Sequence, residues 1–214
     1  MGSRSHNAVI LTEVQHYMYD PLYPEEYEYL QFASDKRCCE FITARHCARV
    51  SLEKLGLQRP VMVPGDHGEP VWPDGVVGSI THCQDYCAAA VAMSCDIAAI
   101  GIDAEQNEPL SDDILAIIAS EDERMHVCSS QKCRPDVALD RLLFCIKECA
   151  YKAWFSLTKT PLSFYEIFAS IDGCGQFKIA LPNYLVEGEE VSYGGTWRKE
   201  GGVVMAELAI VSGG

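Results

Sequence analysis

The clearest pattern along the chain is a set of apolar residues that recur at three- and four-residue steps between positions 38 and 55. This spacing predicts an amphipathic helix, because residues three and four apart lie on one face of a helix. Ser34 has the side chain of an N-cap, and Gly56 is suited to end the helix. A second long helix is predicted from a cap at Asp136 to about Phe155.

Shorter elements account for most of the remaining pattern. Short helices are predicted over 25–33 and after the N-caps Ser111 and Ser120. Strands are predicted over 76–81, 87–93, 97–104, 164–172, 176–181, 190–198 and 203–211. The runs over 87–93 and 97–104 are almost continuously apolar, which indicates central, buried strands.

The order of these elements indicates the fold class. Helix, strands, helices and strands follow one another, which predicts an α+β fold. Two halves, 1–106 and 107–214, each contain one long helix and several predicted antiparallel strands. Because no linker separates the halves, we expect them to pack together as one unit.

The charge of the chain excludes several classes of function. The 214 residues include 17 Lys and Arg but 31 Asp and Glu, which gives a net charge of −14. This balance is not typical of proteins that bind nucleic acid or anionic membranes. No apolar run reaches the ~18 residues of a membrane-spanning helix, and no secretory signal is visible. Six basic residues nevertheless cluster over 36–59.

The chain has eleven cysteines, an odd number, and no Cys-x-x-Cys pair. Structural zinc sites usually combine two close pairs of ligands, which this sequence lacks. Several cysteines fall in apolar helix or strand patterns, where a free thiol behaves as a small hydrophobic side chain. We therefore expect reduced thiols and a cytoplasmic protein.

Carboxylates near the end of a predicted strand form the first candidate site. The side chains of Asp103 and Glu105 point the same way about 7 Å apart. They repel each other unless a cation such as Mg²⁺ lies between them. The simpler alternative to a metal site is a strand end exposed to solvent.

Glu148 and Lys152 share one face of the second long helix. The simpler alternative to a functional role is an ion pair on the protein surface. Their apolar neighbours favour burial, and buried charges need a partner or a role.

Residues that suit phosphate groups form a second candidate site. Thr81 and His82 end a predicted strand, and Arg37 and Arg45 lie eight residues apart on the first long helix. Both arginines are placed to reach an extended polyphosphate, which guanidinium groups bind bidentately. Taken singly, each residue also has an ordinary explanation, as a solvated helix face or a structural histidine.

The order and spacing of these residues together resemble the 4′-phosphopantetheinyl transferases of the surfactin-synthetase-activating type. The nearest likeness is to the enterobactin-synthase component D-like and actinobacterial single-domain subgroup, and it runs from about Lys36 to Phe164. The strings that carry it are EFITARHCAR (40–49), GEPVWPDG (68–75), GSITHC (78–83), GIDAE (101–105) and KECAYKAWF (147–155). The paired G-I-D-x-E and K-E-x-x-x-K motifs are the most specific of these.

The resemblance implies a fold in which two similar α/β halves are related by a pseudo-twofold axis. The N-terminal half, 1–106, would carry the basic helix, the GEP loop, the strand with Thr81, and the D-A-E motif. The C-terminal half, 107–214, would carry the K-E-x-x-x-K helix and a β-rich segment. A chain of this length is implied to be a monomer.

The implied reaction transfers the 4′-phosphopantetheine arm of coenzyme A to a serine of an apo acyl or peptidyl carrier protein and releases adenosine 3′,5′-bisphosphate. Asp103, Glu105 and Glu148 are implied to hold Mg²⁺, with Mn²⁺ as an alternative, and Ala104 offers only its backbone. Glu148, or a water held near the metal, is the candidate base. Lys152 is the candidate acid or charge stabiliser. Asp103 is the third residue implied to be catalytic, together with Glu148 and Lys152.

The coenzyme A site is implied to contain Arg37, Arg45, His67, Gly68, Glu69, Pro70, Thr81, His82, Asp103, Glu148 and Lys152. His67 departs from the family pattern, in which lysine is frequent, so its phosphate contact would depend on pH. We expect an acceptor surface that is more apolar than ionic, over Phe155–Tyr165. The reason is that a chain of net charge −14 repels an acidic carrier at long range.

Two other functions use the same residues. A Mg²⁺-dependent phosphohydrolase would act on coenzyme A-like substrates without a protein acceptor, and an inactive module would bind only coenzyme A or a carrier. The presence of all three carboxylates and the lysine argues against lost activity. The sequence leaves the carrier open among siderophore, polyketide, peptide and fatty-acid synthases.

Overall fold

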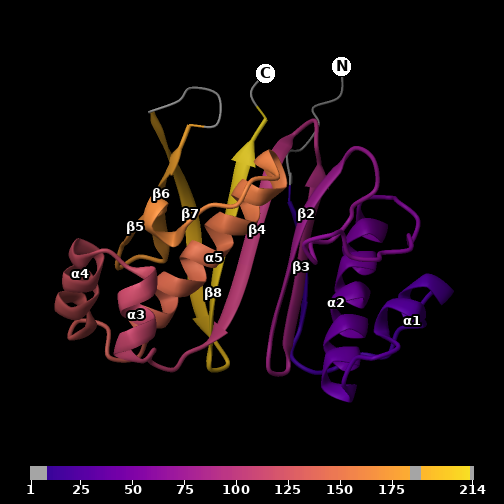
Figure 1. Cartoon of the computed structure of the whole chain (residues 1–214), viewed down its shortest axis with the longest axis horizontal. Coiled ribbons are helices and arrows are strands. Elements are labelled where there is room, and N and C mark those ends of the chain that lie inside the picture. Colours follow the sequence, from indigo (N-terminus) through magenta and orange to yellow (C-terminus); the bar gives the residue numbers. More distant parts are fainter. Residues whose placement is uncertain (1–8, 184–188, 213–214) are drawn as a thin grey trace. The chain divides into compact units, whose positions relative to one another are not determined.

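The computed structural model describes residues 9–183 and 189–212, which form two compact units of helices and antiparallel strands (Figure 1). The first unit comprises the described residues up to Ile100 together with Val211 and Ser212, and the second comprises those of Gly101–Ile210. The predicted mixture of helices and strands is confirmed. The division falls within strand β4 (Ile97–Gln106), so the D-A-E motif belongs to the second unit.

The first unit combines a three-stranded antiparallel sheet with two helices. The strand order is β1 (Ile10–Val14), β3 (Tyr86–Met93) and β2 (Val76–Cys83), and the helices are α1 (Pro24–Leu30) and α2 (Asp35–Lys54). The apolar strand β3 is central, as its composition predicts. The β2–β3 register pairs His82 with Cys87. Strand β1 is not among the predicted strands.

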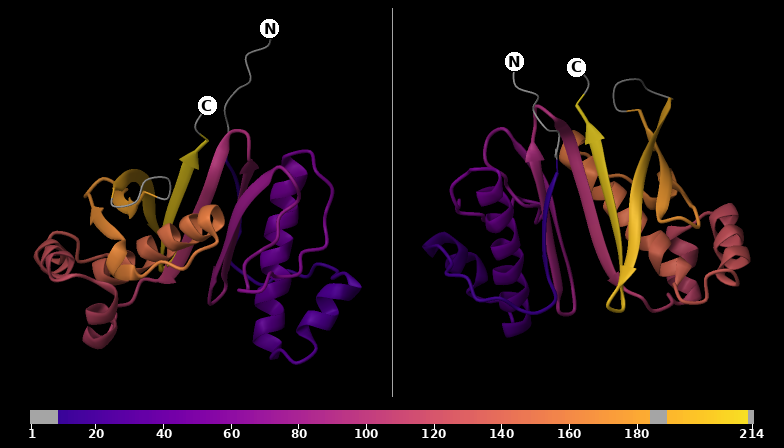
Figure 2. Two further views of the ribbon diagram at one scale, coloured as in Figure 1. Left: turned by 45° about the horizontal axis from the view of Figure 1, so that its top comes forward. Right: turned by 180° about the vertical axis from the view of Figure 1, so that it is seen from behind.

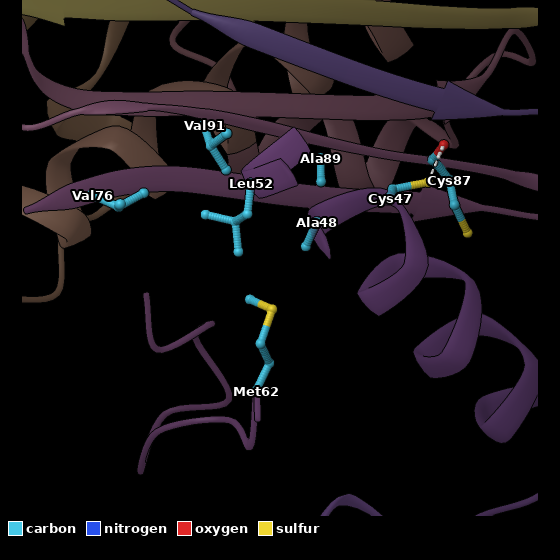
Figure 3. Close-up of a cluster of buried hydrophobic side chains, with 8 residues drawn as sticks. All are labelled: Cys47, Ala48, Leu52, Met62, Val76, Cys87, Ala89 and Val91. Carbon is cyan, nitrogen blue, oxygen red and sulfur yellow. Dashed lines mark hydrogen bonds between the residues drawn. The ribbon is translucent and has the colours of Figure 1, made fainter. Parts of the chain in front are cut away.

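Helix α2 lies against this sheet and buries a hydrophobic core (Figure 3). The core cluster consists of Cys47, Ala48, Leu52, Met62, Val76, Cys87, Ala89 and Val91. Both predicted ends of α2 are confirmed. The Ser34 hydroxyl accepts a hydrogen bond from the Arg37 amide, and Gly56 follows the helix in the left-handed conformation with φ of +82°.

The second unit packs helices on a five-stranded sheet. The strand order is β4, β8 (Val203–Val211), β7 (Glu190–Glu200), β6 (Gln176–Pro182) and β5 (Phe168–Ile171). The helices are α3 (Asp112–Ile118), α4 (Glu121–Gln131), α5 (Leu139–Thr158) and the 3₁₀ turn η1 (Phe164–Glu166). Helix α5 lies across one face of the sheet (Figure 2). Within the described residues, no helix is long and apolar enough to cross a membrane.

The start of α5 differs from the prediction. The helix begins at Leu139 after the N-cap Ala138, not after a cap at Asp136, so that prediction is wrong. Its first amide groups find side-chain acceptors outside the helix: Ala138 donates to Oδ1 of Asn107 at 2.8 Å, and Leu139 donates to Oε1 of Gln131 at 3.0 Å. A local cap is therefore unnecessary.

Two of the predicted strands also differ from those in the structure. The segment predicted as a strand over 164–172 first forms η1, because Ser163 and Glu166 make a capping box that winds the chain into a turn. Strand β4 is buried as predicted, but it stands at the end of its sheet's order rather than in the centre. Its burial includes contact with α5, which packs closely against it at Gly101.

All eleven cysteines are free thiols, as expected. Burial raises the pKa of Cys47 and of Cys87 to about 12. Burial likewise raises the pKa of Cys145 and Cys149 on α5 well above the usual thiol value. Because the thiolate is the reactive form, these four side chains act as small apolar groups of the two cores.

A buried ion pair fixes α5 to its neighbours in the second unit. Nζ of the fully buried Lys147 donates to Oε2 of Glu123 at 2.7 Å, to the Ile118 carbonyl at 2.9 Å and to the Phe164 carbonyl at 3.0 Å. Glu123 also completes the capping box of α4 with the predicted N-cap Ser120, and it accepts from the Ala169 amide. One carboxylate and one ammonium thus join α3, α4, η1 and β5 to α5.

The first unit contains a similar arrangement. Glu26, the capping-box glutamate of α1, accepts two hydrogen bonds at 2.6 and 2.7 Å from Nη2 of Arg49 on α2. Its carboxylate also accepts from the amides of Tyr23 and Met62. Both Glu26 and Arg49 are buried. In each unit, therefore, a short helix is fastened to the long helix through a capping glutamate and a buried cation.

Helix α5 passes very close to β4 at Gly101. A Cβ atom on Gly101 would lie 1.9 Å from the carbonyl oxygen of Cys149 and 2.9 Å from its carbonyl carbon. The Cys149 thiol in turn donates to the Gly101 carbonyl at 3.1 Å. Only glycine permits this approach, which brings the second half of α5 over the strand that carries Asp103.

The buried ion pair leads to a test of stability. Replacing Lys147 by Met leaves the Glu123 carboxylate buried without its cation, so we expect the free energy of unfolding to fall by about 3–5 kcal/mol. Urea denaturation followed by circular dichroism measures this loss. Lys178→Met, at an exposed position of β6, serves as the control and should stay within about 0.5 kcal/mol of the wild type. A Lys147→Met loss below about 1 kcal/mol would contradict the role given to the pair.

The close approach of α5 leads to a second test. Gly101→Ala forces the helix away from β4, and we expect a loss of about 3 kcal/mol in the free energy of unfolding. The control is Gly173→Ala, because a Cβ there would meet no atom within 4 Å. Equal stability of the two alanine variants in urea denaturation would show that the backbones do not constrain each other.

Candidate functional site

The second unit brings two of the predicted site residues, Asp103 and Lys152, into direct contact. Nζ of Lys152 on α5 donates to Oδ1 of Asp103 on β4 at 2.7 Å and to the Ile102 carbonyl at 3.1 Å. Asp103 is 6% exposed, so the pair is largely shielded from solvent. The contact depends on the close approach at Gly101, since that approach sets the distance between helix and strand.

Glu105 has a different partner. Its Oε2 accepts a hydrogen bond at 3.1 Å from Nη1 of Arg141, which lies near the start of α5. The Arg141 Nε donates to the Glu108 carbonyl at 3.0 Å. Arg141 is not among the site residues predicted from the sequence. Its position seven residues before Glu148, on the same helix face, is the signal that could have indicated it.

Charge and burial alter the acid–base properties of this group. Burial, and then the charge of Asp103, raise the pKa of Glu148, while Lys152 opposes the rise. Burial and Asp103 also raise the pKa of Glu105, and Arg141 opposes this. Burial alone would lower the pKa of Lys152, but Asp103 and Glu148 outweigh it and leave the pKa raised. The carboxylates therefore attract protons and cations, and the lysine stays charged.

The donor chemistry of this group suits a hard divalent cation, because Asp103, Glu105 and Glu148 offer only carboxylate oxygens. Ala104 lies buried between the first two and offers only its backbone. Over residues 9–183 and 189–212, no group of three or more His, Cys, Asp or Glu side chains is arranged so that it could hold a metal ion. In the described arrangement, cations from α5 pair with Asp103 and Glu105 instead.

The first unit brings Arg37 and His82 together. Nη1 of Arg37 on α2 lies 3.2 Å from Nε2 of His82 at the end of β2. Glu40, which is not among the predicted site residues, lies 3.8 Å from both the arginine and the histidine. Thr81 is adjacent and buried. A cation, an imidazole and a hydroxyl thus share one region, where they suit an anionic group.

Arg45 is buried, so it does not belong to a solvent-exposed face of α2. It is 6% exposed, its Nε donates to the Met62 carbonyl at 2.8 Å, and its guanidinium lies 4.1 Å from the centre of the Phe41 ring. Burial lowers the pKa of Arg45 to about 10, although Glu26 opposes the shift. The side chain is therefore part of the packing of α2 against the loop that contains Met62.

The loop with the predicted G-E-P motif folds around Glu69. The His67 amide donates to the Glu69 carboxylate at 3.0 Å, and the Gly65 amide donates to the Glu69 carbonyl at 2.8 Å. Gly68 takes a φ of +81°, which a glycine adopts without strain. Pro64 and Pro70 form an isolated bridge, and the His67 side chain is exposed. The loop thus presents an exposed histidine on a well-defined backbone.

Comparisons with known proteins connect these residues to a family. The 4′-phosphopantetheinyl transferase N-terminal domain matches residues 25–92. The 4′-phosphopantetheinyl transferase superfamily matches residues 99–193. Together these matches cover most of both units and include every predicted site residue.

Named relatives agree with the family matches. The 4′-phosphopantetheinyl transferase Svp of Streptomyces mobaraensis is 43% identical over 195 residues, which cover 89% of this chain and 79% of Svp. PptT of Mycobacterium tuberculosis is 37% identical and covers 87% of this chain and 85% of its own length. Enterobactin synthase component D of Escherichia coli is 33% identical over 70% of each chain.

The comparisons support neither a phosphohydrolase nor an inactive binding module. The sequence resemblance to the transferases is confirmed over most of both units and not only over short motifs. The chain therefore belongs to the 4′-phosphopantetheinyl transferase family, and it is an enzyme that transfers the 4′-phosphopantetheine arm of coenzyme A to a carrier protein.

Proposed function

We propose that Asp103, Glu105 and Glu148 of this transferase hold Mg²⁺ while the arm passes from coenzyme A to a serine hydroxyl of an apo acyl or peptidyl carrier protein. Adenosine 3′,5′-bisphosphate is the other product. The observation that carries the proposal is the grouping of Asp103 and Lys152, 2.7 Å apart, with Glu148 one helical turn before the lysine. When bound, the metal would neutralise charge that develops on the pyrophosphate.

Glu148 is the proposed base. Burial and neighbouring carboxylates raise its pKa, so it accepts a proton more readily than an exposed glutamate. The serine hydroxyl is a weak nucleophile, and removal of its proton makes the attack on phosphorus effective. A water molecule near the carboxylates is the alternative base.

Lys152 is the proposed charge stabiliser and acid for the leaving bisphosphate. Because Asp103 and Glu148 keep its pKa raised, Lys152 is positively charged at neutral pH. An ammonium group held at a fixed distance from the carboxylates stabilises charge on a departing phosphate without rearrangement. The Ile102 carbonyl helps to orient it.

The residues of the first unit are proposed to bind the phosphates of coenzyme A. Arg37 offers guanidinium donors beside the His82 ring, whose Nε2 accepts from Arg37 in this arrangement, and the exposed His67 offers a further ring nitrogen. Thr81 and the backbone of Gly68, Glu69 and Pro70 complete the proposed set. Arg45 is assigned to the same site, and its contacts with Phe41 and Met62 give it a structural part as well.

The acceptor surface is proposed to be apolar and to belong to the second unit. Of the residues expected to contact the carrier, Tyr165 is exposed, whereas Leu157, Leu162 and Phe164 are partly buried. Phe164 packs edge-on against Phe144, which accounts for its burial. The Tyr165 hydroxyl donates to the Ala116 carbonyl of α3 at 2.6 Å. Helix α3, which Tyr165 contacts, also carries the exposed Ile114 and Ile117, and we include both in the proposed surface.

Cytoplasmic location and a monomeric state are part of the same proposal. The eleven free cysteines suit a reducing compartment. The pathway served is proposed to be siderophore or other secondary-metabolite synthesis. Enterobactin synthase component D, among the relatives, supports this choice by its name.

The reaction is tested with coenzyme A, Mg²⁺ and an apo carrier protein, by weighing the carrier in a mass spectrometer. We expect the carrier to gain the mass of the phosphopantetheine arm. Asp103→Asn should transfer at less than about a tenth of the wild-type rate, because a lost metal ligand costs several kcal/mol. Asp136→Asn, which alters an exposed carboxylate that pairs with Arg134, should transfer normally. Release of free phosphopantetheine with an unchanged carrier would indicate hydrolysis and contradict the proposal.

The acceptor surface is tested through its dependence on Ile117. Ile117→Ser should raise the KM for the carrier about fivefold with little change in kcat, because it removes roughly 1 kcal/mol of apolar burial. Val211→Ser, at another exposed apolar position, is the control.

The KM for the carrier should stay level or fall as salt rises from about 20 to 200 mM, since screening weakens repulsion between acidic proteins. A KM that climbs steeply with salt would instead indicate ionic docking.

A further inference from the structure

The ion pair between Glu105 and Arg141 is a feature of the second unit that the proposed function leaves unassigned. Arg141 Nη1 lies 3.1 Å from Glu105 Oε2, and its Nε donates to the Glu108 carbonyl at 3.0 Å. The guanidinium is therefore held at two points, by a side chain of β4 and by the backbone beyond it. The side chains of Arg141 and Glu105 are only 23% and 25% exposed, so solvent screens the pair incompletely.

Arg141 shares one face of α5 with the proposed catalytic residues. It lies seven residues before Glu148 and eleven before Lys152, which correspond to about two and three helical turns. Lys152 pairs with Asp103, and Arg141 pairs with Glu105. Helix α5 thus supplies one cation for each of these two carboxylates of β4, so their negative charges are neutralised by side chains of the protein.

A metal ion and Arg141 require the same carboxylate. A divalent cation held by Glu105 would lie within a few ångströms of the guanidinium, where two positive charges repel each other strongly in a half-buried environment. The second anchor, at the Glu108 carbonyl, restrains the guanidinium from moving away. Metal binding must therefore overcome both the existing ion pair and the repulsion.

We propose that Arg141 is a counter-ion that competes with the divalent metal ion for Glu105 and so weakens metal binding by the free enzyme. The inference rests on the proposed function, because it takes Glu105 as a metal ligand. A metal ion already bound to the pyrophosphate of coenzyme A carries less net positive charge, so the competition favours loading of the metal together with the substrate.

Direct metal titration of the whole chain tests this competition. Mn²⁺ is added to the protein without coenzyme A, and the free ion is measured by electron paramagnetic resonance. Arg141→Met should bind Mn²⁺ about tenfold more tightly than the wild type, because a positive charge beside the ion is lost. The matched control is Arg198→Met, which removes an arginine of β7 that pairs with Glu207 of β8. Unchanged or weaker binding by Arg141→Met overturns the proposal, since a residue that only supported Glu105 would weaken binding when removed.

A double-mutant cycle separates competition for Glu105 from a general effect of charge. Glu105→Gln should weaken Mn²⁺ binding, and Arg141→Met added to it should give no further tightening. Equal tightening in both backgrounds overturns the counter-ion role. If circular dichroism shows that Arg141→Met does not fold, Arg141→Gln takes its place, because it also removes the charge and retains a hydrogen-bond donor.

The carrier mass assay and the Mn²⁺ titration distinguish failure of the proposed function from failure of the counter-ion role. A chain that adds no mass to any apo carrier contradicts the proposed function. A chain that transfers the arm, and whose wild-type and Arg141→Met forms bind Mn²⁺ equally, retains that function and overturns the counter-ion role alone.

Discussion

The backbone of α5 passes β4 at Gly101 with no room for a side chain, and the geometry of the candidate site follows from this contact. The Cys149 thiol bonds to the Gly101 carbonyl, and three residues later Lys152 reaches Ile102 and Asp103. A wider spacing would carry the ammonium beyond hydrogen-bond distance of the carboxylate. The glycine of the G-I-D-x-E motif thus has a steric role that is separate from the chemistry of the acidic residues after it.

Charge burial is the second constraint on the structure. Each unit places a capping glutamate, Glu26 or Glu123, where a cation of the long helix and backbone amides can satisfy both of its oxygens. Such a carboxylate is expensive to desolvate, and it is tolerated because both of its oxygens accept hydrogen bonds. The first lysine of the K-E-x-x-x-K motif, Lys147, belongs to this framework, whereas Glu148 and Lys152 belong to the site. Neighbouring residues of one motif therefore serve different purposes.

Local signals predicted much of the fold. Ser34 and Gly56 bound α2 as expected, and the capping box at Ser120 begins α4, because these features involve residues that are close in sequence. The start of α5 was not predictable in this way, since its amides bond to Asn107 and Gln131. Strand β1 was likewise missed, because its place depends on pairing with β3, more than seventy residues later.

The candidate site shows the same division between local and distant information. The motifs predicted the grouping of Asp103 with Lys152, and the structure brings them together. Spacing alone gave no reason to place Glu40 beside His82 or Arg141 beside Glu105, because each pair joins a helix to a strand. Long charged side chains find partners that depend on the angle and distance between elements, which local pattern does not determine.

The distribution of thiols has a practical consequence for spectroscopy on this enzyme. The cysteines of the cores are both buried and hard to ionise. A maleimide dye or spin label reacts with accessible thiolates, and the exposed cysteines are Cys95, Cys128, Cys133 and Cys174. Cys95 lies in the first unit and the other three in the second. Each unit therefore carries a natural attachment point, so probes can be introduced into both without engineering a new cysteine and without opening either hydrophobic core.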